Sequence, residues 1–83
     1  MTAQLQAAIR ARRVVVQRPQ TVAGNVMICF AKQFVKHDLI TPDPITISTG
    51  GTLDLTALPG MTIARLASSN LDRLIMSGAL RLV

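Results

Sequence analysis

Apolar and polar residues alternate over two short stretches in the second half of the chain. Residues 45–49 alternate as a half-buried strand should, and the alternation resumes over residues 52–55. Gly50 and Gly51 lie between the two stretches, and both positions tolerate positive φ, so we expect a β-hairpin here. A phosphate-binding loop would need Lys and Ser or Thr after its glycines, whereas Thr52-Leu53-Asp54 follows.

Residues 26–35 are apolar except for Lys32 and Gln33. They fit either a strand from Val26 to Phe30 or a helix that reaches Lys36, because periodicity does not separate the two in so short a run. The β-branched and aromatic residues favour the strand. Residues 38–44 are interpreted as a loop, since two prolines interrupt any strand ladder there.

The last third of the chain carries a turn, an apolar run, a short helix and a closing strand. Pro59 and Gly60 stand where a type II turn needs them, and residues 61–66 are expected to be extended. Ser69 is the expected N-cap of a helix, and Asp72 falls in its first turn, where the helix dipole favours an acid.

The apolar face and the end of this helix are also visible in the sequence. Leu71, Leu74 and Ile75 follow the i, i+3, i+4 spacing of one apolar face. Gly78 is expected to end the helix in the left-handed conformation, and residues 79–83 leave as a strand.

The N-terminal residues differ in charge from the rest. Residues 1–18 hold four arginines and no acidic residue, a local charge of +4 out of a total of +5. Residues 3–13 are compatible with a short helix, residues 14–16 favour extended backbone, and residues 17–20 are typical of a linker. We expect a basic arm and linker over residues 1–24 and a core domain over residues 25–83. The predicted fold class is α+β: a small β-rich domain, with a hairpin and one short C-terminal helix, and an extended N-terminal arm.

The composition indicates a chain that associates with others. With 83 residues it forms one small domain of marginal stability, and 49% of its residues are hydrophobic while only 16% are charged. Cys29 and His37 are the only residues of their kinds, so we expect no internal disulfide and no metal site. Stability through a homo-oligomer or a protein lattice is the remaining route.

No catalytic constellation is visible. Cys29 lies in an apolar run, so a structural thiol is favoured over a nucleophile with His37 as its base, and His37 is interpreted as a solvated loop residue. The four aspartates are scattered, and we expect no enzyme, cofactor or small-molecule substrate. Only two aromatic residues are present, which disfavours base stacking on single strands. No apolar run is long enough to span a membrane, and the single thiol suits a reducing cytoplasm.

The basic arm is the one feature with a functional interpretation. Its arginines fit nucleic-acid phosphates, while its apolar residues fit a protein partner, and both interpretations stay open. Four phosphate contacts would give a log–log salt slope near about −3.6. The candidate contact residues of the arm are Arg10, Arg12, Arg13, Val14, Val15, Val16 and Arg18.

The segment from Leu58 to Val83 resembles a C-terminal module of small proteins encoded in tailed-bacteriophage structural operons, including those of Mu-like phages. In that module a Pro-Gly turn leads to a strand and then to a short helix ending Leu-Ile-x-x-Gly, here Leu74 to Gly78. The resemblance covers about 26 residues and brings no catalytic residue with it. The structural turn and cap residues are Gly50, Gly51, Pro59, Gly60, Ser69, Asp72 and Gly78.

This resemblance implies a virion protein made in the cytoplasm of the host bacterium. Low charge, small size and the absence of a visible active site suit a minor capsid, cement or head-completion protein. Such a protein would dock on the major capsid protein or a neighbouring virion protein through its arm, and its arginines would face packaged DNA if it lines the shell. The alternative is a small DNA-binding or regulatory module that places the arginines on phosphates.

Overall fold

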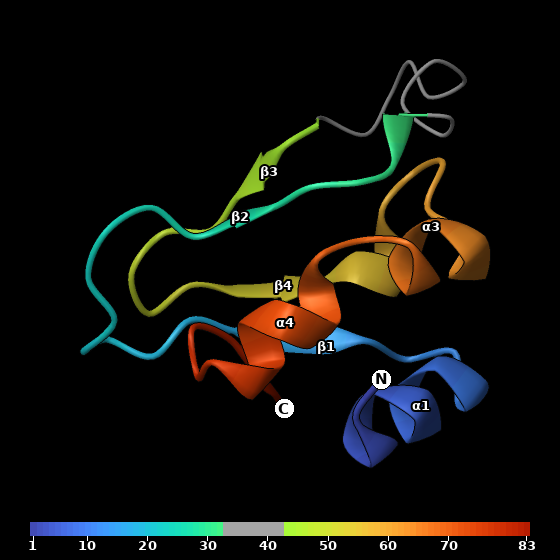
Figure 1. Ribbon diagram of the computed structural model, residues 1–83, viewed down its shortest axis with the longest axis horizontal. Helices are drawn as coiled ribbons and strands as arrows, with labels where there is room; N and C mark the ends of the chain where they lie inside the picture. Colours follow the sequence, from blue (N-terminus) through green and yellow to red (C-terminus); the bar gives the residue numbers. More distant parts are fainter. Residues whose placement is uncertain (33–42) are drawn as a thin grey trace.

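The computed structural model describes residues 1–32 and 43–83. Along the chain these contain the helix α1 (Ala3–Arg10), the strands β1 (Val15–Gln17), β2 (Met27–Ile28), β3 (Ile45–Thr46) and β4 (Thr52–Asp54), the 3-10 helix η1 (Leu55–Ala57), the helices α3 (Ile63–Ala67) and α4 (Leu71–Met76), and the strand β5 (Arg81–Leu82). Helices and antiparallel strands in two small sheets confirm the α+β class (Figure 1).

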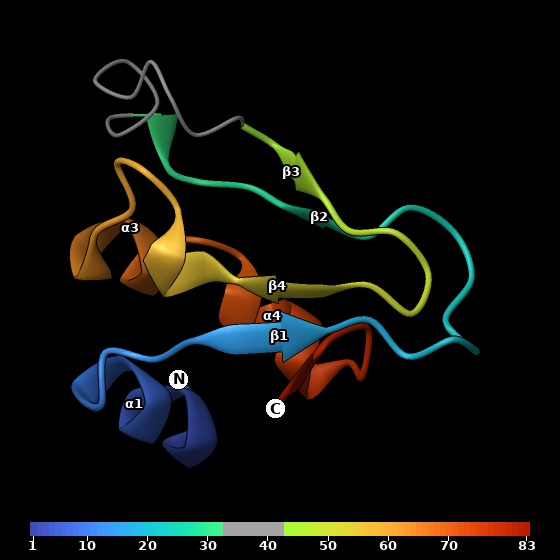
Figure 2. The ribbon, with the colours of Figure 1, turned by 180° about the vertical axis from the view of Figure 1, so that it is seen from behind.

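The larger sheet has three antiparallel strands in the order β4-β1-β5. Its central residue Val16 faces Leu53 on one side and Leu82 on the other, and Val16 is fully buried. The smaller sheet pairs β2 with β3, with Ile28 opposite Ile45. The helix α4 crosses one face of the larger sheet, in front of it in Figure 1 and behind it in Figure 2.

One core is shared by the whole described chain. It is formed by aliphatic side chains from both sheets and from the helices α1, η1, α3 and α4, together with one phenylalanine. The buried apolar residues are Leu5, Val14, Val16, Val26, Ile28, Phe30, Ile45, Ile47, Leu55, Leu66, Leu71 and Leu80.

The expected extended arm over residues 1–24 is wrong. Thr2 caps α1 by accepting a hydrogen bond from the Leu5 backbone N–H at 3.1 Å, and Leu5 is fully buried. β1 then forms the centre of the larger sheet, and Val14 and Val16 lie in the core. A short helix is marginal alone, but burial of its apolar face in a core stabilises it. Residues 1–24 and 25–83 are therefore not two structural units.

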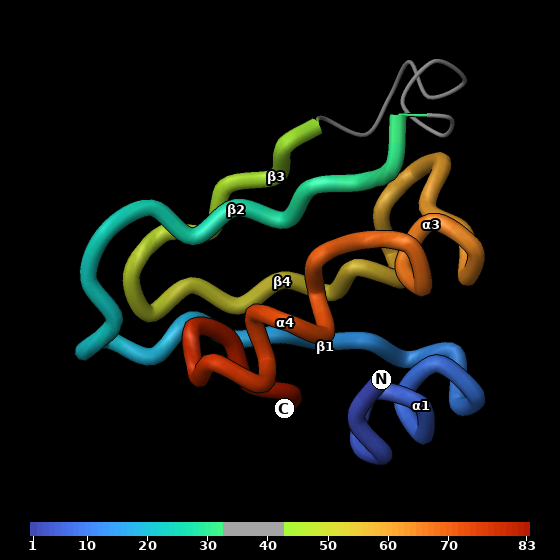
Figure 3. Tube along the Cα trace, viewed as in Figure 1, coloured from blue at the N-terminus to red at the C-terminus, as the bar shows by residue number. Residues whose placement is uncertain are grey.

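The expected hairpin around Gly50 and Gly51 is also wrong, although the turn itself is present. The Gly51 N–H donates to the Ser48 carbonyl at 2.8 Å, and Gly50 has φ +72°. The strands on either side, β3 and β4, pair with β2 and β1 and so belong to different sheets. Alternation identifies the buried face of a strand but not its partner, and the turn carries the chain from one sheet to the other (Figure 3).

Residues 26–30 are extended, as favoured from the sequence, with alternate side chains buried. Val26, Ile28 and Phe30 point into the core, whereas Met27 and Cys29 are exposed. Cys29, expected to be a structural thiol within an apolar run, is therefore not buried. The alternative helix over residues 26–35 is excluded as far as residue 30, and residues 33–35 lie outside the described residues.

The expected turn at Pro59 and Gly60 is confirmed, but the segment that follows it is not extended. The Met61 N–H donates to the Leu58 carbonyl at 3.2 Å, and Gly60 has φ +76°. Residues 63–67 then form α3, whose first turn is capped by the Thr62 hydroxyl accepting from the Arg65 N–H at 3.2 Å. An apolar run of this length fits either state, and the cap at Thr62 decides for the helix.

The last helix and strand agree with the sequence pattern. Leu71 of α4 is fully buried, the helix ends before Gly78 at φ +83°, and β5 follows. The N-cap position is Asn70 rather than Ser69, but the Ser69 hydroxyl does accept a hydrogen bond from the Leu71 N–H at 3.2 Å. Among the described helices, none is long and apolar enough to cross a membrane.

Candidate binding surface at the arginine turn

The helix α1 ends in a tight turn, residues 10–13, which we call the arginine turn. The Arg12 N–H donates to the Ile9 carbonyl at 3.0 Å, and the Arg13 N–H donates to the Ala8 carbonyl at 3.1 Å. This pair of bonds is the Schellman arrangement, in which the residue after the C-cap is left-handed and is usually glycine. Arg12 occupies that position, with φ +55°.

Three arginine side chains project from this turn. Arg10, Arg12 and Arg13 are all exposed. The Arg13 guanidinium donates to the backbone carbonyl of Val83 at 3.1 Å, which links the arginine turn to the end of β5. Within residues 1–32 and 43–83, the side chains of Arg10 and Arg12 make no hydrogen bond or ion pair, so both are available to a ligand.

Two hollows adjoin the arginine turn. The first, which we call the Arg12 cavity, has a volume of about 400 Å³ and is lined by Arg12, Thr56, Met61, Thr62, Ile63 and Leu66. The second, the α1–β5 groove, has a volume of about 490 Å³ and is lined by Gln4, Ala7, Ala8, Ala11, Arg13, Leu82 and Val83. Neither lining contains a carboxylate side chain, so each hollow pairs an apolar wall with a positive charge.

The structure separates the sequence-predicted contact residues into two groups. Arg10, Arg12 and Arg13 gather at the exposed arginine turn. Val14 and Val16 are core residues and Val15 is half-buried in the central strand, so this valine run is not a docking segment. Arg18 does not belong to the exposed group either.

Arg18 is buried, with 6% of its surface exposed. Its guanidinium donates to three backbone carbonyls: Ile47 at 2.8 Å, Val22 at 2.9 Å and Gly24 at 2.6 Å. These carbonyls belong to the loop after β1 and to the segment that crosses between the sheets. Arg18 therefore holds backbone in place and is not available to phosphates, which corrects its assignment as a contact residue.

A second arginine, Arg65 of α3, is also buried. The Arg65 guanidinium lies 4.4 Å from the centre of the Phe30 ring, and one of its nitrogens donates to the Gly60 carbonyl at 3.4 Å. This cation–π contact packs α3 against the extended segment that follows β2. The sequence offers no signal for it, because an arginine in an apolar run is normally assigned to the surface.

Asn70 is a further residue that sequence reasoning missed. Its backbone N–H donates to the Cys29 carbonyl at 3.2 Å, its side-chain oxygen accepts from the Cys29 N–H at 2.8 Å, and its side-chain amide donates to the Met27 carbonyl at 3.1 Å. One residue thus binds the free edge of β2 in place of a neighbouring strand. An asparagine just before an expected helix was the available signal.

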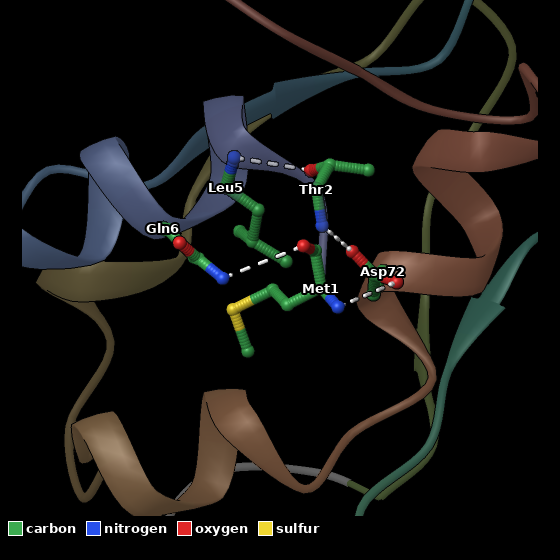
Figure 4. A network of polar contacts seen from close by, with 5 residues as sticks. All are labelled: Met1, Thr2, Leu5, Gln6 and Asp72. Carbon is green, nitrogen blue, oxygen red and sulfur yellow. Dashed lines mark hydrogen bonds and ion pairs between the residues drawn. The ribbon is translucent and has the colours of Figure 1, made fainter.

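Asp72 joins the last helix to the N-terminus, as Figure 4 shows. One carboxylate oxygen accepts from the Thr2 backbone N–H at 2.6 Å, and the other lies 3.8 Å from the Met1 ammonium group. The Leu5 N–H and the Gln6 side chain bond to Thr2 and Met1 in turn. Asp72 lies in the first turn of α4, as expected, but its carboxylate bonds to the residue that caps α1 rather than to a backbone N–H of α4.

No group of three His, Cys, Asp or Glu side chains lies close enough to hold a metal ion among residues 1–32 and 43–83. Cys29 is exposed, and His37, which the sequence analysis interprets as a solvated loop residue rather than as a base for Cys29, lies outside the described residues.

Comparison with known proteins adds no relative. No family model matches this chain, and no curated protein sequence or solved structure matches it either.

Proposed function

We propose that this chain is a non-enzymatic structural protein of a tailed-bacteriophage particle that docks on the major capsid protein or a neighbouring virion protein. The observation that carries this proposal is the arginine turn, which places exposed cations beside the α1–β5 groove. A groove of this kind fits a partner surface that is apolar at its centre and acidic at its rim. The phage setting rests on the resemblance of residues 58–83.

The lining of the groove supports a protein partner. Ala7 and Ala8 of α1 and Ala11 at its C-cap present small side chains, so a partner backbone can approach this helix closely. Leu82 and Val83 supply the apolar opposite wall, and Arg13 supplies positive charge at the rim. An apolar centre within a charged rim is the usual composition of a protein interface.

The test is incorporation into particles by single-residue variants. Deletion of residues 1–18 is uninformative, because it removes α1 and the central strand β1. Ala7→Glu places an acid in the groove on an exposed helical position, and Ala64→Glu is the matched control on the exposed side of α3. Quantitative mass spectrometry of purified particles should find wild type and Ala64→Glu at equal copy number and Ala7→Glu strongly depleted.

Two results would count against this proposal. Absence of the wild-type protein from purified particles would refute the virion assignment. Wild-type copy number for Ala7→Glu would refute docking through the groove while leaving the virion assignment in place.

A second candidate function, DNA binding, is favoured by the three exposed arginines alone. Since Arg18 is buried, three phosphate contacts remain, and the log–log slope of affinity against salt should be about −2.7 rather than about −3.6. Fluorescence anisotropy with a duplex oligonucleotide at several salt concentrations measures this slope. A variant in which Arg10, Arg12 and Arg13 are all glutamine should reduce the slope to near zero if they bind the DNA, and an unchanged slope would assign binding to other residues.

A further inference from the structure

Arg12 occupies a backbone position at which glycine would cost less conformational free energy. In the left-handed region an L-residue brings its Cβ close to the following carbonyl, whereas glycine does not. The chain uses glycine at the equivalent place after α4, where Gly78 has φ +83°. A strained residue at a helix end points to a role for its side chain, because the backbone alone would favour glycine.

The Arg12 side chain has no partner of its own. Its guanidinium makes no hydrogen bond or ion pair with any residue of ranges 1–32 and 43–83. By contrast, Arg13 is bonded to Val83 and Arg18 to three carbonyls. Arg12 instead lines the Arg12 cavity, together with residues of η1 and of α3 and the turn before it.

The rest of the cavity offers one further donor and an apolar wall. The Thr62 hydroxyl oxygen accepts from the Arg65 N–H at 3.2 Å, which leaves its O–H free to donate. The Thr56 hydroxyl lies 2.5 Å from the Asp54 carboxylate and donates to it. Leu66 is buried, and Met61 and Ile63 are half-buried, so their side chains form an apolar surface beside these polar groups.

We propose that the Arg12 cavity binds a carboxylate that carries an apolar group. The planar guanidinium matches a carboxylate in a two-point contact, the Thr62 hydroxyl adds a donor, and the apolar group lies against Met61, Ile63 and Leu66. A phosphate would gain nothing from this apolar wall. The chemistry occurs both in free acyl amino acids and at the C-terminus of a peptide. This inference does not depend on the proposed virion function.

The test uses N-acetyl-leucine as the free carboxylate and N-acetyl-leucinamide as its neutral counterpart. Binding is followed by amide chemical shifts of residues 61–66 in the ¹⁵N-labelled protein. A ligand of this size should bind with a Kd of about 1 mM, whereas the amide should bind at least tenfold more weakly, since it lacks the charge-assisted contact. A hexapeptide ending in leucine distinguishes the source: tighter binding than N-acetyl-leucine indicates a peptide C-terminus, and equal binding indicates a small molecule.

Arg12→Gly separates binding from folding. Because glycine suits φ +55°, this variant should melt at or above the wild-type temperature, yet it should lose binding by a factor of about ten or more. Arg73→Gln, which alters an exposed arginine of α4 outside both linings and away from the arginine turn, should bind N-acetyl-leucine like the wild type. Three results would each overturn the proposal. The acid and the amide could cause equal shifts, or N-acetyl-leucine could cause no saturable shifts at concentrations well above the expected Kd. The third is full binding by a folded Arg12→Gly protein.

Discussion

Asp72, in the first turn of α4, accepts a hydrogen bond of 2.6 Å from the backbone N–H of Thr2, which lies 70 positions earlier in the chain. Thr2 is itself the N-cap of α1. One carboxylate therefore sits at the positive end of its own helix and also fixes the residue that starts another. This contact joins the start of α1 to α4 and so holds the basic N-terminus against the rest of the domain.

Replacement of Asp72 by alanine should destabilise the fold by about 2 kcal/mol, because a charge-assisted hydrogen bond and a favourable helix-dipole contact are lost together. Urea denaturation measures this change. Asp72→Asn keeps an acceptor oxygen and should lose about 1 kcal/mol. The loss in Asp72→Ala should persist in high salt, because the hydrogen bond is screened much less than the 3.8 Å ion pair to the Met1 ammonium.

Arg73→Ala is the control for Asp72, since this neighbour is exposed and its side chain makes no bond to residues 1–32 or 43–83. Its stability should stay within about 0.5 kcal/mol of wild type. An Asp72→Ala protein as stable as Arg73→Ala would show that the link between the two helices contributes nothing.

Replacement of Asn70 by alanine should cost about 2 kcal/mol, because two side-chain hydrogen bonds to the edge of β2 disappear. Hydrogen exchange gives a local readout: the Cys29 amide should exchange faster, since it loses its acceptor at 2.8 Å. Asn25→Ala is a matched control at an exposed asparagine. If the Cys29 amide stayed as protected as in Asn25→Ala, the edge contact would not exist in solution.

Replacement of Arg18 by methionine should be the most damaging of these changes, at about 3 kcal/mol. Methionine keeps the apolar stem but leaves three backbone carbonyls without their donor. Arg18→Lys should recover little, because one ammonium cannot reproduce the planar fork that reaches carbonyls on two segments. Thermal melts compare both with Arg10→Met, which changes an exposed arginine and should melt like wild type. If Arg18→Met melted at the wild-type temperature, Arg18 would instead belong with the exposed arginines that are available to a ligand.

The sequence predicted those features that depend on neighbouring residues. The turns at Gly50 and Gly60 and the helix end at Gly78 follow from local backbone chemistry, and all three glycines have positive φ. The half-buried alternation over residues 45–49 was likewise readable. The pairing of β3 and β4 with separate sheets was not, because nothing in either strand identifies a partner distant in the sequence.

The N-terminal arginines show more clearly the difference between features that neighbouring residues determine and features that the fold determines. Four N-terminal arginines look alike in the sequence, yet Arg18 is buried against carbonyls while Arg10, Arg12 and Arg13 are exposed. Only the path of the chain around β1 distinguishes them. The left-handed conformation of Arg12 was equally hidden, because the usual sequence signal for a helix end is a glycine and here it is missing.

Gly78 follows the end of α4 in the same left-handed conformation that Arg12 adopts after α1, so a substitution of Gly78 tests what this conformation costs. Its φ is +83°, and a Cβ added there would meet no atom within 4 Å, so a substitution acts through backbone strain alone. Gly78→Val should therefore destabilise the protein by about 1–2 kcal/mol, the cost of the left-handed conformation, and Gly78→Asn by less, because asparagine tolerates that conformation. Chemical denaturation of the three proteins should rank them glycine, asparagine, valine. A Gly78→Val protein of wild-type stability would mean that the end of α4 does not depend on this conformation.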